Sequence, residues 1–187
     1  MRGSAAAPLT VVTLLEMQRP PERYPHMPMG PHQLALLRCR EMPLHFYRYI
    51  YDRVGRDWYW TAVLLLDDEQ LAKRLADPAR EVHVLYMDGA PAGFFELHRL
   101  DRKECRLLLF GLMPHAIGKG LSRWFLGCAI RAAWDGGAKL VSVETCTLDH
   151  PAALPLYQKM GFVPVRRSET HAVPVSDEKR AEVLLRR

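Results

Sequence analysis

The chain has 187 residues, of which 49% are hydrophobic and 25% charged, a composition typical of one globular domain or one domain with an extension. Its longest apolar runs, TAVLLLD and CRLLLFGLMP, fall well short of the roughly 20 residues that cross a bilayer, so we expect no membrane partner. The net charge of +5 comes from scattered basic residues, which argues against nucleic acid as a partner but suits an anionic small ligand.

The cysteine pattern gives no sign of a metal site or a disulfide framework. Cys39, Cys105, Cys128 and Cys146 are spread along the chain, without a Cys-x-x-Cys or His-x-x-x-His motif. We therefore expect no bound metal, reduced thiols and a cytoplasmic location. The opening residues lack the long apolar core of a secretory signal, and the start, MRGS, could be a remnant of an expression tag.

The N-terminal part is predicted to be an extended, proline-rich arm over residues 1–31, followed by a folded domain over residues 32–187. Within the arm, Thr10–Leu15 could form an edge strand. The stretch Met17–Pro31 holds too many prolines for a regular helix or a central strand, so we expect it to wrap over the surface.

The first half of the domain begins with an alternating strand at residues 33–41. The spacing of apolar residues predicts a helix over 43–55, and Pro43 suits its first turn. A second helix is expected to begin at Asp67 or Asp68 and to end before Pro78.

The second half opens with two strand-like runs around Asp88-Gly89, a hairpin turn signature. The elements expected next are a buried strand, a helix, a strand, a short helix, a strand and a terminal helix: CRLLLFGLMP, GLSRWFLGCAIRAAWDGGA, KLVSVETCTL, PAALPLYQKMG, FVPVRR and SDEKRAEVLLRR. This order predicts a three-layer α/β fold with a mixed, mostly antiparallel sheet.

The main candidate for a binding site is HAIGKG, which joins the buried strand to the next helix. A helix N-terminus offers unpaired backbone N–H groups and a partial positive charge. Gly118 and Gly120 permit close approach of an anion, Lys119 adds charge, and the N–H groups from Ile117 to Ser122 can converge on one point. Phosphate or pyrophosphate is the natural ligand, and a plain tight turn is the alternative.

Two motifs together resemble the GNAT superfamily of acetyl-CoA-dependent N-acyltransferases. The family turn [Q/R]-x-x-G-x-[G/A] reads HAIGKG here, with His115 in place of Gln or Arg. The later motif N-x-x-A-x-x-L-Y-x-x-x-G-F reads HPAALPLYQKMGF, with His150 in place of Asn. The resemblance covers about residues 33–165 and implies a GNAT-like fold. In that fold the central sheet splays between strands four and five of the family, of which strand four is the one that precedes HAIGKG here, and the gap holds acetyl-CoA.

The resemblance also implies which residues hold the cofactor. The backbone from Gly111 through Leu112 to Met113 would pair with its pantetheine arm. The pyrophosphate would lie in a cradle of six turn residues, Ile117, Gly118, Lys119, Gly120, Leu121 and Ser122. Asp149, His150 and Ala153 would line the outer wall of the channel.

The implied chemistry is direct transfer of an acetyl group from acetyl-CoA to a primary amine in a ternary complex. Tyr157 stands where family members place a tyrosine that protonates the leaving sulfur. A packing tyrosine whose hydroxyl satisfies a backbone group is the alternative. Glu96, in an otherwise apolar strand, and Glu144 are the two candidate general bases; a solvent-facing or arginine-paired glutamate is the alternative for Glu96.

The acceptor would be a small-molecule or peptide amine. Trp58, Tyr59 and Trp60 follow the first helix, where the family's substrate pockets take their walls, and could box an apolar or cationic acceptor; anchoring of the core is the alternative. The N-terminal arm and the C-terminal strand FVPVRR could pair with a second copy of the chain and form a homodimer. A non-catalytic acyl-CoA-binding module is the alternative function.

Overall fold

The computed structural model describes residues 7–101 and 103–186, so the opening MRGS lies outside it. Seven strands form one sheet in the order β2-β3-β4-β5-β6-β1-β7. The strands are β1 (Leu9–Met17), β2 (Leu34–Cys39), β3 (Arg80–Met87), β4 (Ala90–Arg99), β5 (Glu104–Leu112), β6 (Leu140–Cys146) and β7 (Val163–His171). Only the β5–β6 pair is parallel among these described strands, which confirms the mixed, mostly antiparallel sheet.

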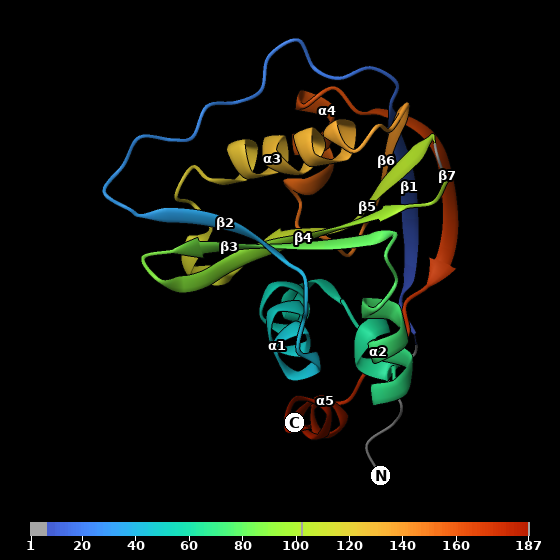
Figure 1. The fold of residues 1–187 in the computed structure, drawn as a ribbon. Coiled ribbons are helices and arrows are strands. Elements are labelled where there is room, and N and C mark those ends of the chain that lie inside the picture. Colours follow the sequence, from blue (N-terminus) through green and yellow to red (C-terminus); the bar gives the residue numbers. More distant parts are fainter. Residues whose placement is uncertain (1–6, 102, 187) are drawn as a thin grey trace.

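Helices cover both faces of the sheet (Figure 1). They are α1 (Leu44–Gly55), α2 (Asp68–Leu75), α3 (Ser122–Asp135), α4 (Ala153–Lys159) and α5 (Asp177–Leu184). One apolar cluster, which includes Phe125, packs α3 and α4 on one face. A second cluster, which includes Tyr47, packs α1 on the other face, and α5 is joined to α1 by the Arg180–Asp52 ion pair. The predicted three-layer fold is thus confirmed.

Local chain signals set the element boundaries as predicted. Asp67 caps α2 by accepting a hydrogen bond from the N–H of Gln70, whose side chain accepts one from the N–H of Asp67 in return. Asp88 and Gly89 connect β3 and β4 with φ angles of 53° and 84°, the left-handed values that a two-residue hairpin turn requires.

The N-terminal strand departs from the prediction. The strand expected at Thr10–Leu15 forms as part of β1, but its predicted edge position is wrong, because β1 lies inside the sheet, where Leu14 is opposite Glu144 of β6 and Arg166 of β7. Leu15 is fully buried as a result. Alternating apolar residues indicate a strand but do not identify its neighbours, and β7, more than 140 residues later in the chain, covers the free side.

The proline-rich segment after β1 runs as an irregular strap across α3 to reach β2 at the far end of the sheet (Figure 1). Pro25 packs beside Gly127 of α3, where an added Cβ would come within 2.8 Å of the proline ring. The Tyr24 ring lies 4.5 Å from the guanidinium of Arg131. The surface wrap predicted for this segment is confirmed, and its contacts fasten it to α3.

Candidate functional site

β5 and β6 separate partway along their length. Their register ends where Leu107 is opposite Val143, although β5 continues to Leu112 and β6 to Cys146. A β-bulge on the β4 side falls at the same level and leaves Leu108 without a partner. Because a bulge bends its strand and increases the local twist, it gives a physical reason for the wedge that opens here.

A cavity of about 770 Å³ fills this wedge. Of the residues predicted to hold a cofactor, its lining includes Gly111, Leu112, Ile117, Gly118, Gly120, Leu121, Ser122, Asp149, His150 and Ala153. Lys119 and Met113 are not in the lining. Met113 is buried, and its N–H donates to the carbonyl of Ala92 over 2.8 Å, towards β4 rather than towards the wedge.

The turn before α3 presents open backbone donors to the cavity. Gly118 and Gly120 have φ angles of 81° and 75°, and no atom lies within 4 Å of where a Cβ would stand. Among residues 7–101 and 103–186, no hydrogen-bond acceptor is found for the N–H groups of Gly118, Gly120 and Leu121. The N–H groups of Ile117 and Lys119 instead donate back into the preceding turn, over 3.3 and 3.4 Å. An anion at this helix start would therefore meet unused donors.

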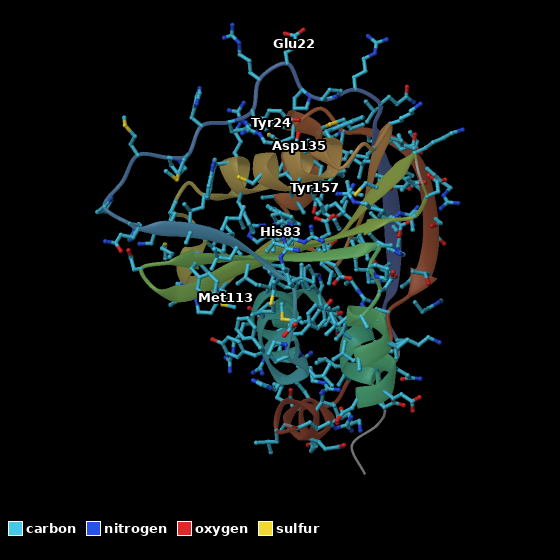
Figure 2. The ribbon with its side chains drawn as sticks, viewed as in Figure 1. Glu22, Tyr24, His83, Met113, Asp135 and Tyr157 are labelled. Carbon is cyan, nitrogen blue, oxygen red and sulfur yellow. The ribbon has the colours of Figure 1, made fainter. Side chains whose placement is uncertain are left out.

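Tyr157 lines the same cavity from α4. It is on the α3 side of the sheet, opposite to Met113 (Figure 2). Its ring packs against Phe110 and Phe162, at centroid distances of 6.4 and 5.9 Å. Burial, and secondly the Asp149 carboxylate, raise the pKa of Tyr157, so its hydroxyl stays protonated. Within the described part of the chain this hydroxyl has no hydrogen-bond partner, unlike the satisfied packing tyrosine that was the alternative.

Asp149 joins two walls of the cavity. Its carboxylate accepts hydrogen bonds from the Thr145 hydroxyl at 2.8 Å and the Cys146 N–H at 2.9 Å. Across the cavity it accepts a third, from the indole N–H of Trp60 at 3.2 Å. The loop after α1 is thus fastened to the end of β6, a contact that the sequence did not predict because 89 residues separate the partners.

His150, which replaces the asparagine of the family motif, has two contacts. Its Nδ1 accepts a hydrogen bond from the N–H of Ala152 at 3.0 Å, just before α4 begins. Its ring meets the Trp58 indole edge to face, with centroids 4.8 Å apart. Trp58 and Trp60 line the cavity, whereas the intervening Tyr59 does not.

The two candidate bases have different surroundings. Glu96 is fully buried, is absent from the cavity lining, and accepts hydrogen bonds from the Tyr47 hydroxyl, Arg74 at 3.0 Å and Arg80 at 2.6 Å. The arginine-paired alternative matches these contacts. Glu144 is exposed, lines the cavity and has Arg166 4.0 Å away. The structure therefore brings Glu144, but not Glu96, into one cavity with Tyr157.

Among the lining residues that sequence reasoning missed are Val12 and Lys159. Val12 belongs to β1, whose place in the sheet no local pattern indicated. Lys159 is in the last turn of α4 and is the only lysine or arginine among the described residues that line the cavity. No group of three or more His, Cys, Asp or Glu side chains in the described residues could hold a metal ion. None of the described helices has the length and apolarity to cross a bilayer.

Comparisons with known proteins agree with this geometry. A family model described as "Acetyltransferase (GNAT) family" matches residues 41–162. No curated protein matches the chain. Among solved structures, a tandem GNAT protein from the clavulanic acid biosynthesis pathway is 15% identical, with a TM-score of 0.59 and coverage of 92% of this chain and 56% of that one.

Two further solved structures share the fold. A GCN5-related N-acetyltransferase from Kribbella flavida is 17% identical, with a TM-score of 0.56 over 89% of this chain and 61% of that chain. An aminoglycoside N-acetyltransferase in complex with CoA is 16% identical, with a TM-score of 0.54 over 75% of this chain and 95% of that chain. The chain spans less than two thirds of the length of the tandem and Kribbella proteins.

Proposed function

Because the chain belongs to the GNAT family of acetyltransferases, we propose that it moves an acetyl group from acetyl-CoA to a primary amine by direct attack in a ternary complex. Acyl transfer is what the family does; the amine acceptor and the direct attack are the proposal. One observation supports it above the others. The glycine turn with its open donors and Tyr157 with its free hydroxyl line one cavity, which lies where β5 and β6 have separated.

The residues present fit acetyl-CoA. A diphosphate needs converging N–H donors. Free donors are provided by Gly118, Gly120 and the first turn of α3. The β5 backbone from Leu108 to Leu112 has no partner on β6, so it is available to the amide groups of a pantetheine arm. When bound, acetyl-CoA supplies a thioester, and its acetyl group is the one transferred.

Side chains of this protein would take a proton from the amine and give one to the leaving sulfur. A free alkyl ammonium has a pKa of about 10.4, so it must lose a proton before it can attack. Glu144 is the carboxylate on the cavity wall that could take this proton, directly or through water. Tyr157 would give its proton to the departing thiolate, and a backbone N–H on the unpaired part of β5 would stabilise negative charge on the carbonyl oxygen. Glu96 remains a predicted base, although Tyr47 and two arginines already bind its oxygens.

The test combines a binding readout with a turnover readout. We expect CoA to raise the melting temperature, and acetyl-CoA with a suitable amine to release thiol. Tyr157→Phe should keep the melting shift but lower kcat by about a hundredfold, since general acids contribute that order of magnitude. Tyr49→Phe, on a ring 41% exposed outside the cavity lining, is the matched control.

Two outcomes would contradict parts of the proposal. Thiol release that is unchanged in Tyr157→Phe would remove the acid role of this residue. A wild-type protein that binds CoA but releases no thiol with any amine would be the non-catalytic acyl-CoA-binding module instead.

A further inference from the structure

The cavity has one exposed carboxylate, Glu144, and on the α1 side of the sheet an aromatic wall that includes Trp60. From this we infer that the acceptor is an amine with a single positive charge on an apolar body, and that polycationic amines are excluded. The inference rests on the proposed function and adds the acceptor class to it.

The aromatic wall is held rigidly. The Trp60 indole N–H is bonded to Asp149, and its ring packs against Tyr51 and Phe94 at centroid distances of 5.5 and 6.1 Å. Gly55 lies so close to this side chain that an added Cβ would come within 2.4 Å of the ring atom Cγ. Trp58 is braced by its contact with His150. Rigid indoles offer an apolar body large contact area, and an ammonium a cation–π partner, at little entropic cost.

The remaining residues around this part of the cavity, from strands and from α1, are largely apolar. Val12 of β1 is directly opposite Cys146 of β6, and both line the cavity. Val54 of α1 lies against Gly111 of β5, where an added Cβ would come within 2.3 Å of its Cγ1, so only a glycine fits beneath the helix. The surface that would receive the acceptor thus consists of the aromatic wall and further apolar side chains.

The charges in the cavity allow one ammonium group. Among the described residues, its lining holds three formally charged side chains, Glu144, Asp149 and Lys159. The Asp149 carboxylate already accepts three of the about four hydrogen bonds that a carboxylate can take, so it has little capacity left for a second ammonium. Glu144 is exposed and can attract one cation before it takes a proton from it.

A second positive charge on the acceptor would be unfavourable. Arg166 of β7 reaches to 4.0 Å from Glu144 and offsets part of its negative charge. An additional ammonium would meet like charge or lose its hydration without a partner, and both are costly. A polyamine or an amino sugar needs several carboxylates, which these walls do not offer.

The experiment compares primary amines that differ in charge and apolar body, using the full chain and acetyl-CoA. We expect kcat/KM for 2-phenylethylamine and hexylamine to exceed that for spermidine and kanamycin by about tenfold or more. A polycation used as well as phenylethylamine would overturn the inference and leave the acetyltransferase proposal standing. Absence of any CoA melting shift would instead count against the proposed function.

A binding readout covers a protein that binds CoA without turnover. In the presence of CoA, phenylethylamine should raise the melting temperature more than spermidine at equal concentration and ionic strength. An equal or larger shift with spermidine would overturn the acceptor class independently of catalysis.

Charge reversal on β7 gives the sharpest variant. Arg166→Glu puts a second carboxylate beside Glu144, so it should raise kcat/KM for spermidine relative to phenylethylamine by about fivefold. Arg167→Glu is the matched control, because neighbouring residues of a strand point to opposite faces of the sheet. If both variants shift the preference equally, long-range charge rather than this site sets it, and the inference fails.

The aromatic wall is tested separately. Trp58→Ala should raise KM for phenylethylamine by about fivefold while KM for methylamine, which has no apolar body, changes little. Tyr49→Ala, an exposed aromatic residue outside the cavity lining, is the control. An equal loss for both amines would show a merely structural role for Trp58 and would contradict the inference.

Discussion

The indole N–H of Trp60 donates to the carboxylate of Asp149 over 3.2 Å, and this bond ties the loop after α1 to the loop after β6 across the mouth of the wedge. The same carboxylate binds the Thr145 hydroxyl and the Cys146 N–H. One side chain therefore sets the distance between the aromatic wall and the strand that carries Glu144. It also contributes to the raised pKa of Tyr157.

Asp149→Ala should lower both stability and activity. The substitution leaves the buried hydroxyl of Thr145 and the Trp60 N–H without their acceptor, and we expect a loss of about 2 kcal/mol in the free energy of unfolding. Urea denaturation measures this loss, and Asp57→Ala, at an exposed aspartate, is the control. Equal stability of the two variants would show that the hydrogen bonds of Asp149 to Trp60 and Thr145 do not form in solution.

Gly118→Ala should weaken CoA binding beyond its effect on folding. A Cβ at a φ of 81° costs about 1 kcal/mol, and this one would also project into the cradle that the turn forms. Gly89→Ala in the β3–β4 hairpin is a close match, with a φ of 84° and equally open surroundings. Both variants should lose similar stability, but only Gly118→Ala should reduce the melting shift with CoA. A full shift in Gly118→Ala would place the cofactor elsewhere.

Removal of residues 1–31 should abolish cooperative unfolding. The deletion takes away β1 and leaves β6 and β7 without their shared neighbour. The boundary predicted at residue 32 treats the remainder as a folding unit, and a compact, cooperatively unfolding fragment of residues 32–187 would support it. As point variants, Leu15→Ala should cost about 3 kcal/mol at a fully buried site, whereas Leu9→Ala, 57% exposed, should change stability by less than about 0.5 kcal/mol.

What the sequence predicted well is local. The capping aspartate of α2, the Asp88-Gly89 hairpin and the glycine turn each depend on the dihedral angles of a few consecutive residues, and each lies where the pattern indicated. The order of strands and helices follows from the same kind of signal, together with periodicity. Local signals of this kind therefore suffice to predict the fold class.

What the sequence left open depends on contacts between distant segments. The position of β1 is set by pairing with strands at the other end of the chain, and Val12 enters the cavity only through that pairing. The partners of Glu96 come from α1, α2 and β3, and no spacing in its own strand indicates them. A carboxylate in an apolar strand signals a partner but does not say whether the partner is a substrate or an arginine.

Alkaline pH should destabilise the protein through its buried tyrosines. Burial raises the pKa of Tyr51 to about 12, against about 10 in an unfolded chain. The folded state then holds this proton more tightly, so its contribution to stability is complete below pH 10 and is lost as the pH rises towards 12. Between pH 8 and pH 11, Tyr51→Phe should therefore lose about 1 kcal/mol less than the wild type in the free energy of unfolding, as measured in urea. Tyr49→Phe, which removes a hydroxyl from an exposed ring, is the control, and an equal loss in the Tyr51 variant would mean that this hydroxyl is not buried in solution.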